Sequence, residues 1–149
     1  MGFKTQLDIG CFDWERASGE FLTRPLTAAE VDAAIIRSGG RLMADGHATE
    51  PQLTVIARLM AERGGQDVRG FLGREPVVRH PSGYARLALD QRSAGPVAAF
   101  VRLLCGEFGC GVYVWDHDER EPARVIAWLE QLAEQRHAEP GAAADGGGM

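Results

Sequence analysis

Lysine, cysteine and long apolar runs are scarce in this chain of 149 residues. Lys4 is the only lysine among sixteen basic residues, and this preference for arginine is typical of a high-GC bacterial genome. No segment approaches the ~18 uninterrupted apolar residues of a membrane-spanning helix. Residues 1–10 lack the basic region and apolar core of a secretory signal. With three cysteines and no secretory context, we expect reduced thiols and a cytoplasmic location.

A basic stripe is also missing. Sixteen basic residues face twenty-one acidic ones, which gives a net charge of −5 with both signs mixed along the chain. Nucleic-acid binding depends on neutralised phosphates and therefore on clustered positive charge. The charge pattern argues against a nucleic-acid partner and favours a basic one.

The composition is that of a globular protein. Hydrophobic residues make up 45% and charged residues 25% of the chain, close to the average for folded domains. A chain of this length buries enough apolar surface to fold without metal or disulfides. We predict a single domain over residues 1–136, followed by a disordered tail rich in alanine and glycine at 137–149.

Helical spacing of apolar residues and capping signals predict four helices. Thr27 and Glu30 have the spacing of a capping box, in which each side chain satisfies a free backbone N–H. Pro51, Pro96 and Pro122 fall in first turns, where a missing N–H costs little. The predicted helices are Leu26–Gly39, Thr49–Arg63, Gly95–Cys105 and Glu121–Arg136.

Alternating and continuous apolar runs predict the strands. The predicted strands are Phe3–Ile9, a short piece at Arg41–Ala44, the two arms of a hairpin over Pro76–Asp90, and Gly111–Trp115.

Gly111–Trp115 is continuously apolar, which favours a central strand buried on both faces. Gly10–Arg24 is interpreted as a loop, and Gln66–Glu75 stays unassigned. The fold class is therefore α+β: four or five strands in a mostly antiparallel or mixed sheet, packed by three or four helices.

The first candidate for chemistry follows the Gly111–Trp115 strand. Asp116, His117 and Asp118 combine carboxylates with an imidazole, which could relay a proton. The alternative is structural, because acids before a helix cap its N–H groups and complement its dipole. Asp118 and Glu119 would serve as such caps for the last helix.

Cys11 is a second candidate because it follows the first strand. If that strand ran parallel to Gly111–Trp115, then Asp8, Cys11 and Asp13 would lie near His117 and could form a catalytic site. Antiparallel pairing would separate the two groups.

Metal and cofactor motifs are not found. Cys105 and Cys110 are spaced C-x4-C with no second ligand pair, so zinc is not expected, and Cys105 is interpreted as a small buried hydrophobe. The glycine pairs at 39–40 and 64–65 follow predicted helices and match no phosphate-binding loop. We expect neither a metal nor a cofactor.

Aromatic residues gather in the first loop. The candidate binding residues are Phe12, Asp13, Trp14, Glu15 and Phe21. Aromatic side chains are enriched at interface hot spots, and loops often carry binding functions. The alternative is that these rings fold back onto the sheet as a secondary core.

These observations lead to a functional hypothesis with two alternatives. The hypothesis is a small acidic protein-binding module without catalytic activity, similar in size, charge and layout to toxin-neutralising immunity proteins or inhibitors, an analogy at the level of fold. One alternative is a small enzyme with a site around residues 116–118. The other is a ferredoxin-like regulatory domain that binds a small molecule, with Tyr113 and Trp115 either lining the site or filling the core. The oligomeric state is left open.

Overall fold

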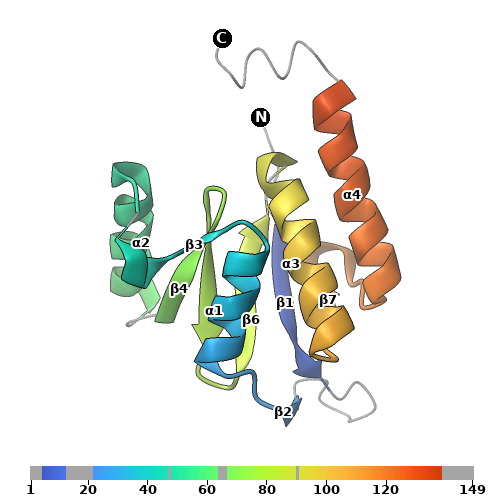
Figure 1. Cartoon of the computed structure of the whole chain (residues 1–149), viewed down its shortest axis with the longest axis horizontal. Coiled ribbons are helices and arrows are strands. Elements are labelled where there is room, and N and C mark those ends of the chain that lie inside the picture. Colours follow the sequence, from blue (N-terminus) through green and yellow to red (C-terminus); the bar gives the residue numbers. More distant parts are fainter. Residues whose placement is uncertain (1–4, 13–21, 47, 64–66, 90, 139–149) are drawn as a thin grey trace.

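The computed structural model describes residues 5–12, 22–46, 48–63, 67–89 and 91–138. Within these ranges the chain forms one seven-stranded sheet and four α-helices (Figure 1). The strands are β1 (Thr5–Phe12), β2 (Leu22–Arg24), β3 (Arg41–Leu42), β4 (Asp67–Leu72), β5 (Glu75–His80), β6 (Tyr84–Leu89) and β7 (Gly111–Val114). The helices are α1 (Ala28–Arg37), α2 (Glu50–Arg63), α3 (Ala94–Glu107) and α4 (Pro122–Ala138).

Every strand pairing in the sheet is antiparallel. The order across the sheet is β7-β1-β6-β5-β4-β3, and β2 pairs with the last residues of β1. Helices α1, α3 and α4 lie side by side over one face, whereas α2 lies beside the β3–β4 edge (Figure 1). The long β1 strand therefore lies between β6 and β7, in the half of the sheet covered by α3.

The core lies between the sheet and the layer of α1, α3 and α4. In β1, the residues Leu7, Ile9 and Cys11 point into it and are almost fully buried. The helices contribute apolar side chains at helical spacing, such as Phe100 on α3 and Leu129 on α4. Burying these side chains supplies most of the favourable free energy of folding.

The N-terminal capping contacts of the first two helices form as predicted. At α1 the Thr27 hydroxyl accepts the Glu30 N–H at 3.1 Å, and the Glu30 carboxylate accepts the Thr27 N–H at 2.9 Å. At α2 the Thr49 hydroxyl accepts the Gln52 N–H at 3.4 Å. Of the described side chains of α2, Ile56 alone is buried, so this helix packs against little of the core.

The fold class is confirmed, but the predicted number of four or five strands was wrong. The additional strand β2 falls in the stretch interpreted as a loop, and β4 falls in the glycine-rich stretch left unassigned. The predicted hairpin is confirmed as β5 and β6, joined by a turn at 81–83 in which Gly83 has φ +103°.

The prediction of a central strand at Gly111–Trp115 was also wrong. Among the named strands β7 pairs with β1 alone, and its buried and half-buried residues alternate. Its apolar run reflects one buried face, with Val112 and Val114, and one face with the half-buried Tyr113, followed by the exposed Trp115 in the next turn.

Two general features complete the fold. Helix α4 continues to Ala138, and the predicted tail beyond it falls outside the described residues. No described helix combines the length and the apolar character needed to cross a membrane.

Candidate functional site

Asp8 is a nearly buried carboxylate on the face of the sheet opposite α1, α3 and α4. The residue is 5% exposed, and its carboxylate accepts three hydrogen bonds. Arg86 donates through Nε to Oδ1 at 2.8 Å and through Nη2 to Oδ2 at 3.0 Å. Trp115 donates through its indole N–H to Oδ2 at 2.9 Å. A buried charge needs such partners, because leaving it unpaired would cost several kcal/mol.

Arg86 connects this carboxylate to a group of rings. Its Nη2 also donates to the Tyr84 hydroxyl at 3.0 Å, and its guanidinium lies 5.3 Å from the centre of the Tyr84 ring. His80 stacks on Tyr84 with ring centres 4.5 Å apart. The hydrogen bonds that Arg86 donates to Asp8 raise the pKa of Arg86 above its ordinary value, so the guanidinium stays charged at physiological pH.

On the β7 side the same surface continues through two further aromatic residues. The Tyr113 ring meets the Trp115 ring edge-on at 5.1 Å, and Arg120 lies over Tyr113 at 5.5 Å. The Tyr113 hydroxyl donates to Asp118 at 2.8 Å, and this bond raises the pKa of the Tyr113 phenol. Trp115 is 49% exposed despite its hydrogen bond to Asp8.

Together these side chains form a continuous surface that we call the sheet-face cluster. It consists of Asp8, His80, Tyr84, Arg86, Tyr113 and Trp115. Phe12 adjoins it, with its ring 5.7 Å from that of Tyr84. The helices with close contacts to β1 and β7 are α3 and α4, which pack on the core side. Within the described part of the chain, the cluster is therefore a connected arrangement of rings and charge that faces away from the helix layer.

The sequence prediction placed Tyr113 and Trp115 as liners of a site or as core, considered His80 only as a base that could approach Cys11, and named neither Tyr84 nor Arg86 as a site residue. The structure shows that neither Tyr113 nor Trp115 belongs to the buried core. The alternation of apolar residues along β6 did indicate this face, because Tyr84 and Arg86 alternate with the buried residues of that strand and so point to the opposite side of the sheet.

The two parts of the predicted catalytic site are not brought together. Because β1 and β7 are antiparallel with Gly10 opposite Gly111, Cys11 lies at the end of β1 where β7 begins. His117 follows the other end of β7. The geometric argument for a joint site of Cys11 and His117 required parallel strands, so it does not apply.

The residues after β7 do not converge either. Asp116 and His117 belong to a 3-10 turn, and the His117 ring lies edge-on against Trp128 at 5.0 Å. Asp118 has φ +49° and accepts the hydrogen bond from Tyr113. His117 and Asp118 thus contact different neighbours, and Asp116 is exposed.

Of the two residues expected to cap the last helix, Glu119 accepts backbone N–H groups just before it, and Asp118 does not. One oxygen of Glu119 accepts the N–H groups of Arg120 and Glu121, both at 3.1 Å. Helix α4 begins directly afterwards at Pro122. Glu119 therefore stabilises the turn that leads into the helix, whereas Asp118 is turned towards β7.

The predicted binding loop is seen at its first residue. Phe12 ends β1 and adjoins the sheet-face cluster. Asp13, Trp14, Glu15 and Phe21 lie outside the described residues. Their proposed role in binding therefore stays a prediction.

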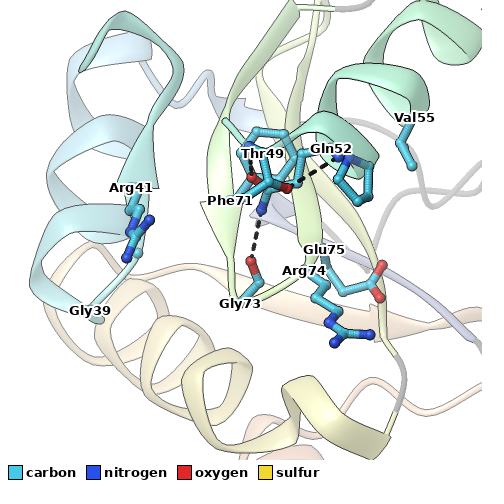
Figure 2. Close-up of a pocket in the computed structure, with 11 residues that line it drawn as sticks. Gly39, Arg41, Thr49, Gln52, Val55, Phe71, Gly73, Arg74 and Glu75 are labelled. Atoms are coloured by element: carbon cyan, nitrogen blue, oxygen red, sulfur yellow. Dashed lines mark hydrogen bonds between the residues drawn. The ribbon is translucent and has the colours of Figure 1, made fainter. Parts of the chain in front are cut away.

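A cavity lies at the other end of the sheet, between α2, β3 and the β4–β5 turn (Figure 2). Its volume is about 790 Å³, and it is lined by polar groups such as Arg41, Thr49 and Arg74 together with Phe71 and Val55. A hydrogen bond of 3.1 Å from the Gln52 amide to the Gly73 carbonyl joins its two walls. The described residues contain no group of three or more His, Cys, Asp or Glu side chains arranged to hold a metal.

Comparison with known protein families, with curated proteins and with solved structures gave no match in any of the three. The function therefore has to be argued from the geometry of the site itself.

Proposed function

We propose that this chain is a non-catalytic protein-binding module that docks a basic segment of a partner protein on the sheet-face cluster. The observation that carries the proposal is the exposed, hydrogen-bonded Trp115, which lies in a continuous row with Tyr113, Arg86 and Tyr84. Tryptophan, tyrosine and arginine are the residues most enriched at binding hot spots.

The cluster is preorganised for binding. The indole of Trp115 and the guanidinium of Arg86 are both held by Asp8, so their rotamers are already restricted before a partner arrives. Binding then costs less side-chain entropy, which is on the order of 0.5–1.5 kcal/mol for each side chain that has to be immobilised.

The negative charge of the chain indicates that the partner is basic. The exposed carboxylates of Asp116, Asp118 and Glu121 follow Trp115 directly in the chain, and the whole chain carries a net charge of −5. Opposite charge accelerates association and selects partners. A basic enzyme or toxin that is neutralised by an acidic inhibitor or immunity protein is the kind of complex that fits these features.

The experiment starts with capture of a partner from native cell lysate and then measures the identified, purified partner by titration calorimetry. Trp115→Ala should weaken its binding by at least about tenfold, as expected for a hot-spot residue. The matched control is Met60→Ala on α2, since Met60 is similarly exposed at 51% but lies outside the cluster. Affinity should also fall as salt is added, because exposed charges are screened.

The result that would overturn the proposal is equal affinity for the wild-type chain and for folded Trp115→Ala. Circular dichroism of both variants shows whether each is folded. A partner that is acidic, or whose binding is unaffected by salt, would also contradict the assignment of a basic segment.

The cavity beside α2 supports a second candidate function, the binding of a small anionic molecule. Its volume of about 790 Å³ is in the range of ligand sites, and its lining includes two basic residues, Arg41 and Arg74, and one acidic residue, Glu75. A thermal-shift screen of carboxylate and phosphate compounds tests this. A stabilising compound should lose its effect in Arg41→Ala, and a screen without any stabilising compound would remove this candidate.

A further inference from the structure

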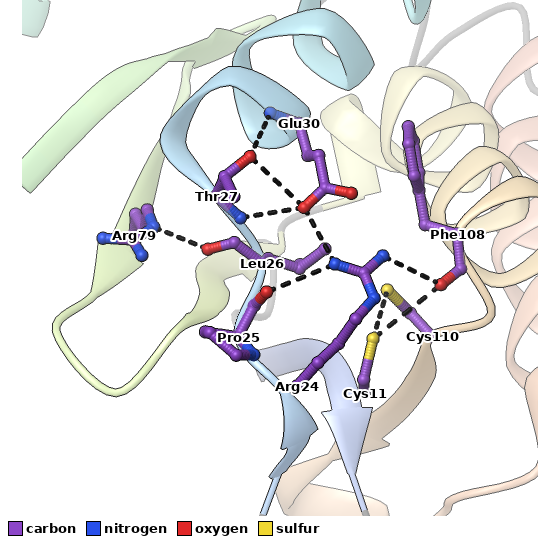
Figure 3. A network of polar contacts seen from close by, with 9 residues as sticks. All are labelled: Cys11, Arg24, Pro25, Leu26, Thr27, Glu30, Arg79, Phe108 and Cys110. Carbon is purple, nitrogen blue, oxygen red and sulfur yellow. Dashed lines mark hydrogen bonds and ion pairs between the residues drawn. The ribbon is translucent and has the colours of Figure 1, made fainter.

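The sulfur atoms of Cys11 and Cys110 face each other across two neighbouring strands (Figure 3). Their Sγ atoms lie 3.8 Å apart, although the residues are separated by 99 positions in the sequence. Both residues are 5% exposed, and both are free thiols. The contact is therefore created by the fold and joins the end of β1 to the residue before β7.

The backbone supports this contact. Gly10 and Gly111 are opposite each other in the antiparallel pairing of β1 and β7, and Cys11 and Cys110 are the next residues outward. Cα atoms of cross-strand neighbours are about 4.5–5.5 Å apart, within the range of about 4.4–6.8 Å that a disulfide spans. Small side-chain rotations would bring the sulfur atoms to bonding distance.

A surface hollow borders one of the two cysteines. Cys110 lines a surface hollow of about 610 Å³, together with Gly109, Gly111 and the turn before α4. Hydrogen peroxide is small enough to enter such a hollow, whereas a protein disulfide catalyst would be excluded from two residues that are each 5% exposed.

We propose that Cys11 and Cys110 are a site of oxidative modification at which a small hydroperoxide forms a cross-strand disulfide. One sulfur attacks an oxygen of the hydroperoxide, and the O–O bond of the hydroperoxide breaks. That cysteine becomes a sulfenic acid, and the leaving group departs as an alcohol, or as water when the oxidant is hydrogen peroxide. The second sulfur then attacks the first, the S–O bond breaks, and the hydroxyl departs as water with the second thiol's proton. The two thiols together lose two protons and two electrons, which reduce the hydroperoxide to an alcohol, or to water, and one further water.

The surroundings of the pair indicate a slow reaction. Burial, followed by the neighbouring thiols, raises the pKa of Cys110, and the guanidinium of Arg24 opposes this increase. Arg24 is held close by hydrogen bonds to Glu30 at 3.0 Å and to the Phe108 carbonyl at 3.4 Å. Because the thiolate is the reactive form, the pair should respond to sustained oxidation rather than to brief pulses.

Cys105 is the rival partner, because it is near Cys110 in the sequence. It is half-buried on α3 and has no sulfur contact with another described cysteine. Burial raises its pKa to about 11. The geometry thus assigns the bond to Cys11 and Cys110 and leaves Cys105 reduced.

The test exposes the full reduced chain to graded hydrogen peroxide and maps the products by mass spectrometry under non-reducing conditions. Cleavage after Arg and Glu separates Cys105 from Cys110, because Glu107 lies between them. The wild-type chain and Cys105→Ser should both lose two hydrogens and yield one peptide pair joined through Cys11 and Cys110, and dithiothreitol should reverse this. Cys11→Ser and Cys110→Ser should form no intramolecular bond.

A bond that includes Cys105, or three thiols that stay reduced or end as sulfinic acids, would overturn the proposal. A thermal scan gives a second measurement: oxidation should raise the unfolding midpoint of Cys105→Ser and leave that of Cys110→Ser unchanged. Should a serine variant fail to fold, the peptide map of the wild-type chain alone still decides between the pairings.

Discussion

Asp8 on β1 and Arg86 on β6 are direct cross-strand neighbours that form a side-on ion pair with two parallel hydrogen bonds of 2.8 and 3.0 Å. The pair lies on the face of the sheet away from the helix layer, with only 7% of the Asp8 side chain and 26% of the Arg86 side chain exposed. This relationship fixes the centre of the proposed binding surface, and it makes that surface part of the stability of the fold.

Replacement of Asp8 by Asn should destabilise the chain strongly. The variant leaves the guanidinium of Arg86 without its carboxylate, and removing one partner of a buried pair costs about 3–5 kcal/mol. Since Arg86 retains some exposure to water, we expect about 2–3 kcal/mol in urea unfolding. Asp116 is exposed, so the control variant Asp116→Asn should change the free energy of unfolding by less than about 0.5 kcal/mol. Equal effects of both variants would show that the ion pair is not important for folding.

Stability should fall in acid partly through Glu30. The hydrogen bonds from Arg24 and from the Thr27 backbone lower the pKa of Glu30 from its usual 4.5. A lowered folded-state pKa contributes stability that is present above the unfolded value and is lost as the pH falls through the folded value. Urea unfolding between about pH 6 and pH 3 should therefore show a shallower decline for Glu30→Gln than for the wild-type chain. Identical slopes would contradict this role of the capping box.

Two glycine-to-alanine variants should change stability in opposite directions. Gly106 lies in α3 without close neighbours for an added Cβ, so alanine should stabilise the helix by about 0.5–1 kcal/mol. Gly83 has φ +103°, and an added Cβ would collide with Pro25, so alanine there should cost about 1–3 kcal/mol. Thermal unfolding of the pair checks both signs, and a stabilising Gly83→Ala would refute the turn geometry.

Helix α2 should open more readily than α3. Ile56 is the only buried residue among the described side chains of α2, whereas α3 buries Phe100, Leu104 and four others. Helices with few buried contacts exchange their amide hydrogens through local opening rather than global unfolding. Hydrogen exchange should show lower protection in α2, and Leu104→Ala should cost about 2–5 kcal/mol, as core truncations do. Comparable protection in both helices would mean that α2 is anchored more firmly than its burial indicates.

Local signals were sufficient to predict the helices from the sequence. Thr27 and Glu30 specify a start by their spacing alone, and the hairpin of β5 and β6 follows from alternation around Pro81-Ser82-Gly83. Strand β4 could not be predicted in this way. Its glycines left the stretch unassigned, but Gly70 is needed in the strand because any Cβ there would collide with the carbonyl of Arg41 on β3.

The sheet-face cluster depends on strand order, which local patterns do not encode. Asp8, Arg86 and Trp115 come from three distant segments and meet because β1 pairs with β6 on one side and β7 on the other. Tyr113 and Trp115 were ambiguous for the same reason. A run of apolar residues predicts burial on both faces of a strand, but whether both faces of the sheet are covered is a property of the whole topology.

The edges of the sheet limit how this protein can meet other chains. One edge ends in β3, which has two residues, and the other in β7, where Val114 exchanges backbone hydrogen bonds with Glu119 of its own chain. Within the described ranges, neither edge offers a long row of unused N–H and C=O groups onto which a foreign strand could be added. Binding of a partner by addition of a strand to the sheet is thereby disfavoured, and so is fibrous self-assembly, which uses the same backbone groups. A partner would have to distinguish this molecule by its side chains.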